Sequence, residues 1–172
     1  APGSTPWTYS TAGLNLDFLA AGESISFSYT VKATDNNGAV ATDVVAFVIT
    51  GANDKPTISA SAAVPFQEAL NASAQVLSQS GTVSFTDIDA SDTVSISYLS
   101  NNNIRWSGGT LDSSLITALL NGFSTSTTNA DAPGSTPWTY STAGLNLDFL
   151  AAGESISFSY TVKATDNNGA VA

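Results

Sequence analysis

Alternation of apolar and polar residues dominates the chain and predicts β-strands. In residues 24–31, Ile, Phe, Tyr and Val alternate with Ser and Thr, which is typical of a strand that buries one face. Residues 82–85 and 93–98 repeat this alternation. Residues 44–49 form a continuous apolar run, which suits a strand that is covered on both faces or in contact with a neighbour. Clusters of Gly, Asn, Asp and Pro separate these short runs, and this spacing predicts an antiparallel β-sandwich.

Two stretches depart from the strand pattern. Residues 113–122 carry paired apolar positions at helical spacing, with Ser before them and Asn-Gly after them, which predicts one short helix. Residues 14–22 predict a single helical turn that ends at Gly22. Residues 101–103 and 124–129 are predicted loops. The expected fold class is therefore all-β, with one short helix.

An exact internal repeat indicates how the chain is organised. Residues 1–41 recur without change as residues 132–172, an offset of 132 − 1 = 131 residues. A unit of this length is typical of one domain and far exceeds the period of about 20–50 residues found in solenoids. The repeat therefore indicates a tandem array of separate domains, each with its own core and all with the same role.

The continuation of the first copy shows where one unit ends. After residue 41 the chain runs through an apolar strand and then reads Gly-Ala-Asn-Asp-Lys-Pro. The proline restricts the residue before it to extended conformations, which makes a short and stiff connection. We therefore expect residues 1–51 to be the C-terminal part of one repeat, 52–56 to be a linker, and 57–172 to be the next repeat without its last strand.

Composition narrows the function classes. There are 14 Asp and Glu residues against 4 Lys and Arg, a net charge of −10, which argues against nucleic acids and anionic membrane surfaces as partners. No segment approaches the roughly 18 consecutive apolar residues of a membrane span. The chain contains no Cys, Met or His, so disulfides, thiolate metal sites and the commonest zinc ligand are excluded.

The carboxylates gather at turns. One cluster is Asp87-Ile88-Asp89 with Asp92, a second is residues 35–38, and Asn53-Asp54 lies in the linker. Ca2+ takes about 6–8 oxygen ligands of this kind, whereas zinc and copper favour His or Cys. These clusters favour a calcium site. The alternative is that Asp and Asn simply suit turns and keep the surface soluble.

Several motifs resemble the VCBS-type repeats of giant bacterial adhesins of the RTX type, and more distantly a cadherin repeat. The G-x-N-D-x-P ending after an apolar strand is the most specific of them. The resemblance covers nearly the whole chain and is carried by Trp7-Thr8-Tyr9 and residues 16–23, 27–31, 35–38, 48–56 and 81–89.

The cadherin resemblance implies that calcium lies between consecutive domains, held by a Glu, an Asp-x-Asp, a late Asp and an Asn-Asp linker. The residues of this chain that match those positions are Glu23, Asn53, Asp54, Asp87, Asp89 and Asp166. The linker here departs from the cadherin pattern because it has fewer acidic residues and contains Lys55. We therefore expect one or two ions at each junction.

The leading expectation for function is a structural extender on the surface of a bacterial cell. Identical neighbouring repeats of the same polypeptide would be its partners, and calcium in the linkers would cancel the repulsion between carboxylates and stiffen the array. Such a protein is secreted, acts outside the cell in adhesion and biofilm formation, and is not an enzyme.

The sequence offers less support for two other functions. A module that binds a carbohydrate or a surface would use aromatic faces, and Trp106 next to Arg105 is the aromatic side chain most expected to be exposed. The pattern Trp-x-Tyr at Trp7 and Tyr9, repeated at 138–140, instead favours core positions for those side chains. A catalytic carboxylate pair, Asp87 and Asp89, is conceivable, but no nucleophile has a partner base.

The missing strand raises a separate expectation. Residues 57–172 lack the equivalent of 42–50, so the sheet would have an unpaired edge. We expect strand 43–49 of another molecule to fill that edge, because residues 51–56 span at most about 20 Å. The alternative is that the chain is a window on a continuous filament.

Overall fold

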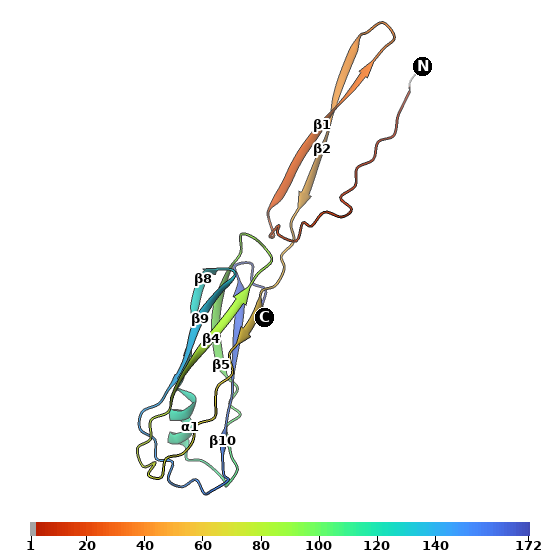
Figure 1. Ribbon diagram of the computed structural model, residues 1–172. Helices are drawn as coiled ribbons and strands as arrows, with labels where there is room; N and C mark the ends of the chain where they lie inside the picture. The colour runs from red at the N-terminus through yellow and green to blue at the C-terminus, as the bar shows by residue number, and fades with distance from the viewer. Residues whose placement is uncertain (1–2) are drawn as a thin grey trace.

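The computed structural model describes residues 3–172 and shows a mostly β chain of antiparallel sheets (Figure 1). A long hairpin lies at one end, and residues 57–172 form the larger body. The fold class expected from the sequence is confirmed at this level, including the short helix. The elements are β1 (Ser24–Thr34), β2 (Val40–Thr50), β3 (Thr57–Ala60), β4 (Ser78–Thr86), β5 (Thr93–Ser100), β6 (Arg105–Trp106), α1 (Ser113–Leu120), β7 (Phe123–Thr125), β8 (Thr127–Asp131), β9 (Gly134–Ser141), β10 (Ile156–Ser157) and β11 (Tyr160–Asp166).

The hairpin joins β1 to β2 along their whole length. Ile25 lies opposite Ile49 and Phe27 opposite Phe47, so these apolar side chains share one face. The Phe27 and Phe47 rings stack with centroids 5.3 Å apart. The connecting turn contains Asp35, whose Oδ1 accepts two backbone N–H bonds within the turn. Of the face that the pattern of residues 24–31 predicted to be buried, Ile25 and Phe27 are partly covered, whereas Tyr29 and Val31 are 55% and 47% exposed.

Residues 57–172 build one core to which two larger sheets contribute. The strand order is β3-β4-β9-β7 in one sheet and β11-β5-β8 in the other, and β10 pairs with β6. Both sheets supply buried side chains to the same cluster, including Val83 and Phe85 from β4, Val94 and Ile96 from β5, and Trp138 from β9. The alternating residues of these strands account for this core.

Helix α1 closes the end of the core away from the hairpin (Figure 1). Asp112 caps its N-terminus by accepting the Ser114 N–H at 2.8 Å. The hydroxyls of Tyr140 and Tyr160 donate to the carbonyl of Leu119 at 2.9 and 3.1 Å, which satisfies a backbone group that every helix C-terminus leaves open. No described helix is long and apolar enough to cross a membrane.

Two local predictions were wrong, and a third was correct in one of its two alternatives. Residues 124–129 were expected to be a loop but lie largely in β7 and β8, because their Ser and Thr residues pair with β9 and β5. Residues 14–22 form successive turns instead of a helical turn, and Gly22 has φ 87°. The apolar run of β2 pairs with β1 along its whole length, which agrees with the second of its two predicted environments, while Val44 and Val48 on its open face are 58% and 64% exposed.

The two copies of the repeated sequence have different surroundings. Trp138 lies in β9 between β4 and β7 and is 4% exposed, whereas its twin Trp7 lies outside any described strand and is 61% exposed. The expectation that the Trp-x-Tyr pair belongs to the core holds for residues 138–140 and not for Trp7. The same residues therefore become strand or coil according to the strands available beside them.

This difference allows a matched pair of substitutions. Trp138→Ala should lower the free energy of unfolding by about 3–5 kcal/mol, because it leaves a large cavity in the core. Trp7→Ala, the same change in the same local sequence, should cost less than about 1 kcal/mol. Urea denaturation followed by circular dichroism measures both values. Equal losses would show that the two copies have equivalent environments.

Candidate metal centre at the junction

The connection between the hairpin and residues 57–172 is formed by four short segments. They are the linker 51–56, the turn 16–23 that precedes β1, the loop 87–92 between β4 and β5, and the turn 166–170 that follows β11. Each segment carries acidic or amide side chains because a short polar residue stabilises a tight turn. Four turns that meet at one place therefore bring several carboxylates together.

Direct hydrogen bonds tie the linker to the larger body. The Asp54 N–H donates to Asp89 Oδ2 at 2.8 Å, and Asn53 Nδ2 donates to Asp166 Oδ2 at 3.0 Å. The turn before β1 is attached as well, since the Ala90 N–H donates to the Phe18 carbonyl at 3.0 Å. The linker is consequently held against two loops of the body and is not a free tether.

Close packing explains the first residue of the linker. The backbone of Gly51 passes so near the carbonyl oxygens of Leu19 and Ala20 that a Cβ at this position would clash with them. Leu19 and Ala20 are themselves buried. A clash with backbone atoms is relieved only by moving the chain, so this approach requires glycine.

Three carboxylates converge at the centre of the junction. Asp87, Asp92 and Asp166 each place an oxygen within 4.8 Å of the other two, and this group could hold a metal ion. Asp92 and Asp166 are only 4% and 5% exposed. Buried carboxylates so close together repel strongly unless a cation or a proton balances their charge.

Unpartnered oxygen atoms lie beside this group. Within residues 3–172, the buried side-chain atoms without a hydrogen-bond partner are Asn53 Oδ1, Asp87 Oδ2 and Asp89 Oδ1. Asp89 is 2% exposed, and a buried acceptor that is left unpaired costs about 1–3 kcal/mol. All three atoms are hard oxygen donors at the junction, where a bound cation would satisfy them.

The crowded negative charges change the pKa of one carboxyl, that of Asp87. Burial raises the pKa of the Asp87 carboxyl above its ordinary value of 3.8, and the negative charges of Asp89, Asp92 and Asp166 raise that pKa further. The hydrogen bond from the Asp89 N–H opposes this increase. The surroundings of Asp87 thus make its ionised form less favourable than that of an isolated carboxyl.

The chemistry of the donors fits a hard divalent cation. Carboxylate and amide oxygens are the only side-chain donors gathered here, and the chain contains neither His nor Cys. Softer metals would favour nitrogen or sulfur ligands. Asp92 Oδ2 accepts a bond from Asn168 Nδ2, and Asp166 Oδ1 accepts the backbone N–H groups of Asn168 and Ala170. These bonds fix both carboxylates in position.

The residues named from the sequence occupy different places in this site. Asp87 and Asp166 belong to the converging group, and Asn53 bonds to Asp166. Asp89 lies outside that group and accepts the Asp54 N–H, whereas the Asp54 side chain is exposed. Glu23 lies at the edge, beside Ala90 and Ser91. Its Oε2 accepts the N–H of Ala20 at 3.0 Å in its own turn.

Asp92 belongs to the centre but was not assigned as a ligand from the sequence. Its place three residues after Asp89 was visible, yet nothing in the spacing showed that its side chain turns inward. The structure supplies the reason: the Asp92 N–H bonds to the Asp89 carbonyl at 3.2 Å, and Asn168 holds the carboxylate from the other side.

The aromatic residue proposed for sugar binding is only half exposed. The Nε1 of Trp106 donates to Glu154 Oε2 at 3.2 Å, and the ring packs edge-on against Phe149 with centroids 4.8 Å apart. These contacts cover part of the face that would stack on a sugar.

Comparison with known proteins gives no relative from which a role could be transferred. No protein-family model matches the chain, and a search of curated proteins finds no match either. The case for the site therefore depends on the geometry of its own residues.

The Asp87 titration predicts how stability depends on pH in the presence of a chelator. A carboxyl whose pKa is raised in the folded state contributes stability below its unfolded pKa of about 3.8 and loses it as the pH rises through the folded value. Asp87→Asn should abolish that loss. Denaturation midpoints of both proteins, measured at several values between about pH 3 and 7, give the difference in their stability at each pH.

A second carboxyl, that of Asp112, also makes the stability of both proteins depend on pH. Hydrogen bonds from Ser114 lower the pKa of Asp112, so its contribution to stability is instead lost as the pH falls. That contribution is present in both proteins and cancels in their difference. A difference that does not change with pH would contradict the assigned strain at Asp87.

The repeat provides a matched control for metal binding. Asp166 and Asp35 occupy identical turns, and each accepts backbone N–H bonds through Oδ1. Asp166→Asn should remove the rise in melting temperature produced by Ca2+, while Asp35→Asn should preserve it. At calcium concentrations about 100 times the Kd, the stabilisation lost is about 2.7 kcal/mol.

Calorimetric titration and thermal melting measure these effects. Both substitutions change the same turn sequence, and the comparison of each protein with and without calcium isolates the calcium-dependent part. An unchanged calcium response in Asp166→Asn would place the ion elsewhere.

Proposed function

We propose that the chain is an extender segment of a bacterial cell-surface adhesin, built from cadherin-like β-sandwich repeats whose junctions bind Ca2+. The observation that carries the proposal is the group of unpartnered, buried oxygens shared between the linker and the loops of the following unit. A cation bound by several segments at a junction would fix the positions of those segments relative to one another, and this would stiffen the junction.

The repeated sequence supports the architectural half of the proposal. An identical stretch of 41 residues returns after 131 positions, and its second copy contributes β9 and β11 to the two larger sheets. Two antiparallel sheets around one core are what a β-sandwich repeat requires. Identical neighbours imply one task performed many times along a filament.

Calcium is the cation that the donor set favours. The free oxygens of Asn53, Asp87 and Asp89, with the carboxylates of Asp92 and Asp166, approach the number of ligands that Ca2+ takes, and water completes the shell. Mg2+ would keep more of its own water and demand a stricter octahedron. Calcium is also abundant outside cells, which agrees with the resemblance to secreted adhesins.

Without the ion, charge repulsion would loosen the junction. Two carboxylates about 4 Å apart repel by about 4 kcal/mol at an effective dielectric constant of about 20. The hydrogen bonds that hold Asn53 and Asp54 each contribute about 1–3 kcal/mol, so they do not outweigh several such repulsions. We therefore infer that the linker bends in the absence of calcium and straightens when it binds.

The same view accounts for what the chain lacks. A protein without cysteine cannot use disulfides to harden its domains, and metal binding stabilises the folded state by mass action. The carboxylates have a structural task in this proposal, and no catalytic role is assigned to them.

Small-angle scattering on a polypeptide of several consecutive repeats tests the proposal. We expect a longer maximum dimension in calcium than in chelator, because each junction stiffens when the repulsion is cancelled. Equal dimensions in the two conditions would remove the extender function, whatever the calcium affinity.

A charge-matched pair of substitutions provides the control. Asp92→Asn at every junction should give the short dimension in both conditions, since it removes a central carboxylate. Asp17→Asn makes the same charge change at an exposed position outside the central group and should leave the calcium response intact.

A further inference from the structure

One turn occurs twice in the chain, because residues 16–23 and 147–154 have the same sequence. Both copies fold in the same way. In each, the glutamate carboxylate accepts the backbone N–H three residues before it at 3.0 Å, and the glycine has a φ angle of 87° in one copy and 88° in the other. The turn therefore keeps one shape in two different surroundings.

The first copy shows what this turn contacts. Its Phe18 carbonyl accepts the N–H of Ala90, in the loop between β4 and β5, at 3.0 Å. Phe18 and Glu23 also line a hollow together with Ala90 and Ser91. The turn at the end of one unit is thus the surface on which the following unit places its 87–92 loop.

The second copy carries an additional side chain. It directly precedes β10, at the end of residues 57–172 that lies away from the hairpin (Figure 1). The indole of Trp106 packs edge-on against Phe149, with ring centroids 4.8 Å apart, and its Nε1 donates to Glu154 Oε2 at 3.2 Å. Phe149 and Glu154 are the equivalents of Phe18 and Glu23, so Trp106 lies against the two positions that line the hollow in the first copy.

The backbone around Trp106 is fixed against the turn. The Ser107 N–H donates to the Ser155 carbonyl at 3.0 Å, and the Ser155 N–H donates to Ser107 Oγ at 2.9 Å. Gly108 passes so close to the Glu154 carboxylate that a Cβ at this position would clash with it. The indole is consequently held in one place on the surface of the turn.

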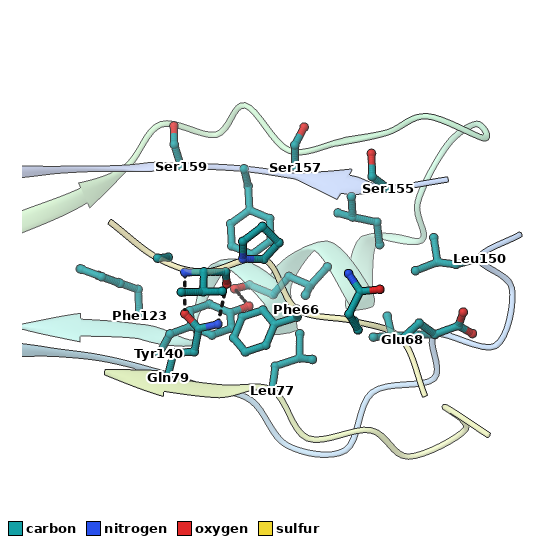
Figure 2. A pocket seen from close by; sticks show the side chains of 18 of the residues that line it. Phe66, Glu68, Leu77, Gln79, Phe123, Tyr140, Leu150, Ser155, Ser157 and Ser159 are labelled. Carbon is teal, nitrogen blue, oxygen red and sulfur yellow. Dashed lines mark hydrogen bonds between the residues drawn. The ribbon is translucent and has the colours of Figure 1, made fainter. Parts of the chain in front are cut away.

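The inner side of the second turn is already occupied, and its outer side is open. Leu150 lies at one end of an apolar groove between the segment 60–68 and β10, and Figure 2 shows it at the same end as Ser155. Phe149 does not line that groove and is 39% exposed, and Trp106 is half-buried. Aromatic surface therefore remains uncovered at this end of the unit.

The first junction shows that an indole and the loop fit together on the turn. The residue 131 positions before Trp106 falls outside the sequence, so this junction contains the turn without its indole. The Phe18 ring is 44% exposed there, although the Ala90 N–H is bonded to its carbonyl. The loop thus leaves free the ring on which the indole packs in the second copy.

We propose that Trp106, Phe149 and Glu154 form a docking surface for the 87–92 loop of the following repeat in the same polypeptide. This inference rests on the proposed array of repeats and names a surface through which one repeat contacts the next. The turn has the sequence and shape of residues 16–23, so the loop bonds to its phenylalanine carbonyl in the same way. Trp106 then lies at the edge of that contact.

Burial of apolar area stabilises this contact. The rings of Trp106 and Phe149 offer aromatic surface, which contributes most when water is excluded from it. The loop supplies apolar surface of its own, since Ile88 is 52% exposed. Tryptophan is also enriched among the residues that dominate the energetics of protein interfaces.

Fluorescence tests the docking surface in a longer polypeptide. Residues 42–172 and then 42–51 are appended after Ala172, the twin of Ala41, so that both complete units carry the same strands. The first Trp106 then has a repeat after it, and the appended Trp106 has none. Substituting each in turn, Trp106→Phe, and subtracting the spectra gives the emission of each indole. We expect the first indole to emit at a shorter wavelength and to be quenched less by acrylamide, because the docked loop excludes water.

A cross-link tests where the loop lies. The chain has no cysteine. Ser107→Cys, combined with Ser91→Cys in the appended repeat, should be joined by a short bis-maleimide, because Ser107 bonds to Ser155, whose equivalent Ser24 lines the hollow with Ser91. In the control, Ser91→Cys is placed in the same repeat as Ser107→Cys, at the other end of β5 and about 26 Å away, and should not be joined. Peptide mass spectrometry identifies the products.

Each outcome decides the proposal. A protected first Trp106 together with the cross-link supports it. Equal emission from the two Trp106 side chains overturns it, and so does a missing cross-link. If the polypeptide lengthens in calcium while both indoles stay equally exposed, the extender function stands and the docking surface is wrong. If the first indole is protected and the length does not respond to calcium, the docking surface stands and the extender function is wrong.

Discussion

Asp89, Asp92 and Asp166 are buried at the junction, with the Asp87 carboxyl beside them. This buried negative charge must be balanced by groups from the linker, the loop after β4 and the turn after β11. Backbone N–H groups and amide side chains neutralise part of it and leave single oxygens unpaired. Position and charge are thus coupled: the arrangement of the hairpin against the body depends on how this charge is balanced.

The repeated sequence shows how far tertiary surroundings decide local structure. Residues 134–141 become the central strand β9 because β4 and β7 pair with both of its edges. The same sequence at residues 3–10 forms no described strand. Similarly, β1 is one continuous strand, whereas its twin is interrupted between β10 and β11, where Asn101 and Asn103 bond to Ser159.

The sequence pattern predicted that strands and an acidic junction exist, but it did not predict all of their residues. Alternation identified β1, β4 and β5, because one buried face imposes a period of two. It could not identify β7 and β8, whose Ser and Thr residues carry no apolar period. In the site, spacing pointed to Asp87 and Asp89, but the inclusion of Asp92 depends on a loop conformation that local sequence does not specify. Glu23 satisfies its own turn, which residue type alone could not show.

The full-length pairing of β1 with β2 has a mechanical consequence. Both strands run along the long axis of the molecule (Figure 1), but the chain enters β1 at Ser24 and leaves β2 at Thr50, and these two residues pair with each other. Tension along the polypeptide would therefore act on the junction end of the hairpin and open its eleven residue pairs one after another. Such a hairpin would lengthen in small steps under load, and the turn between its strands would be the last part to open.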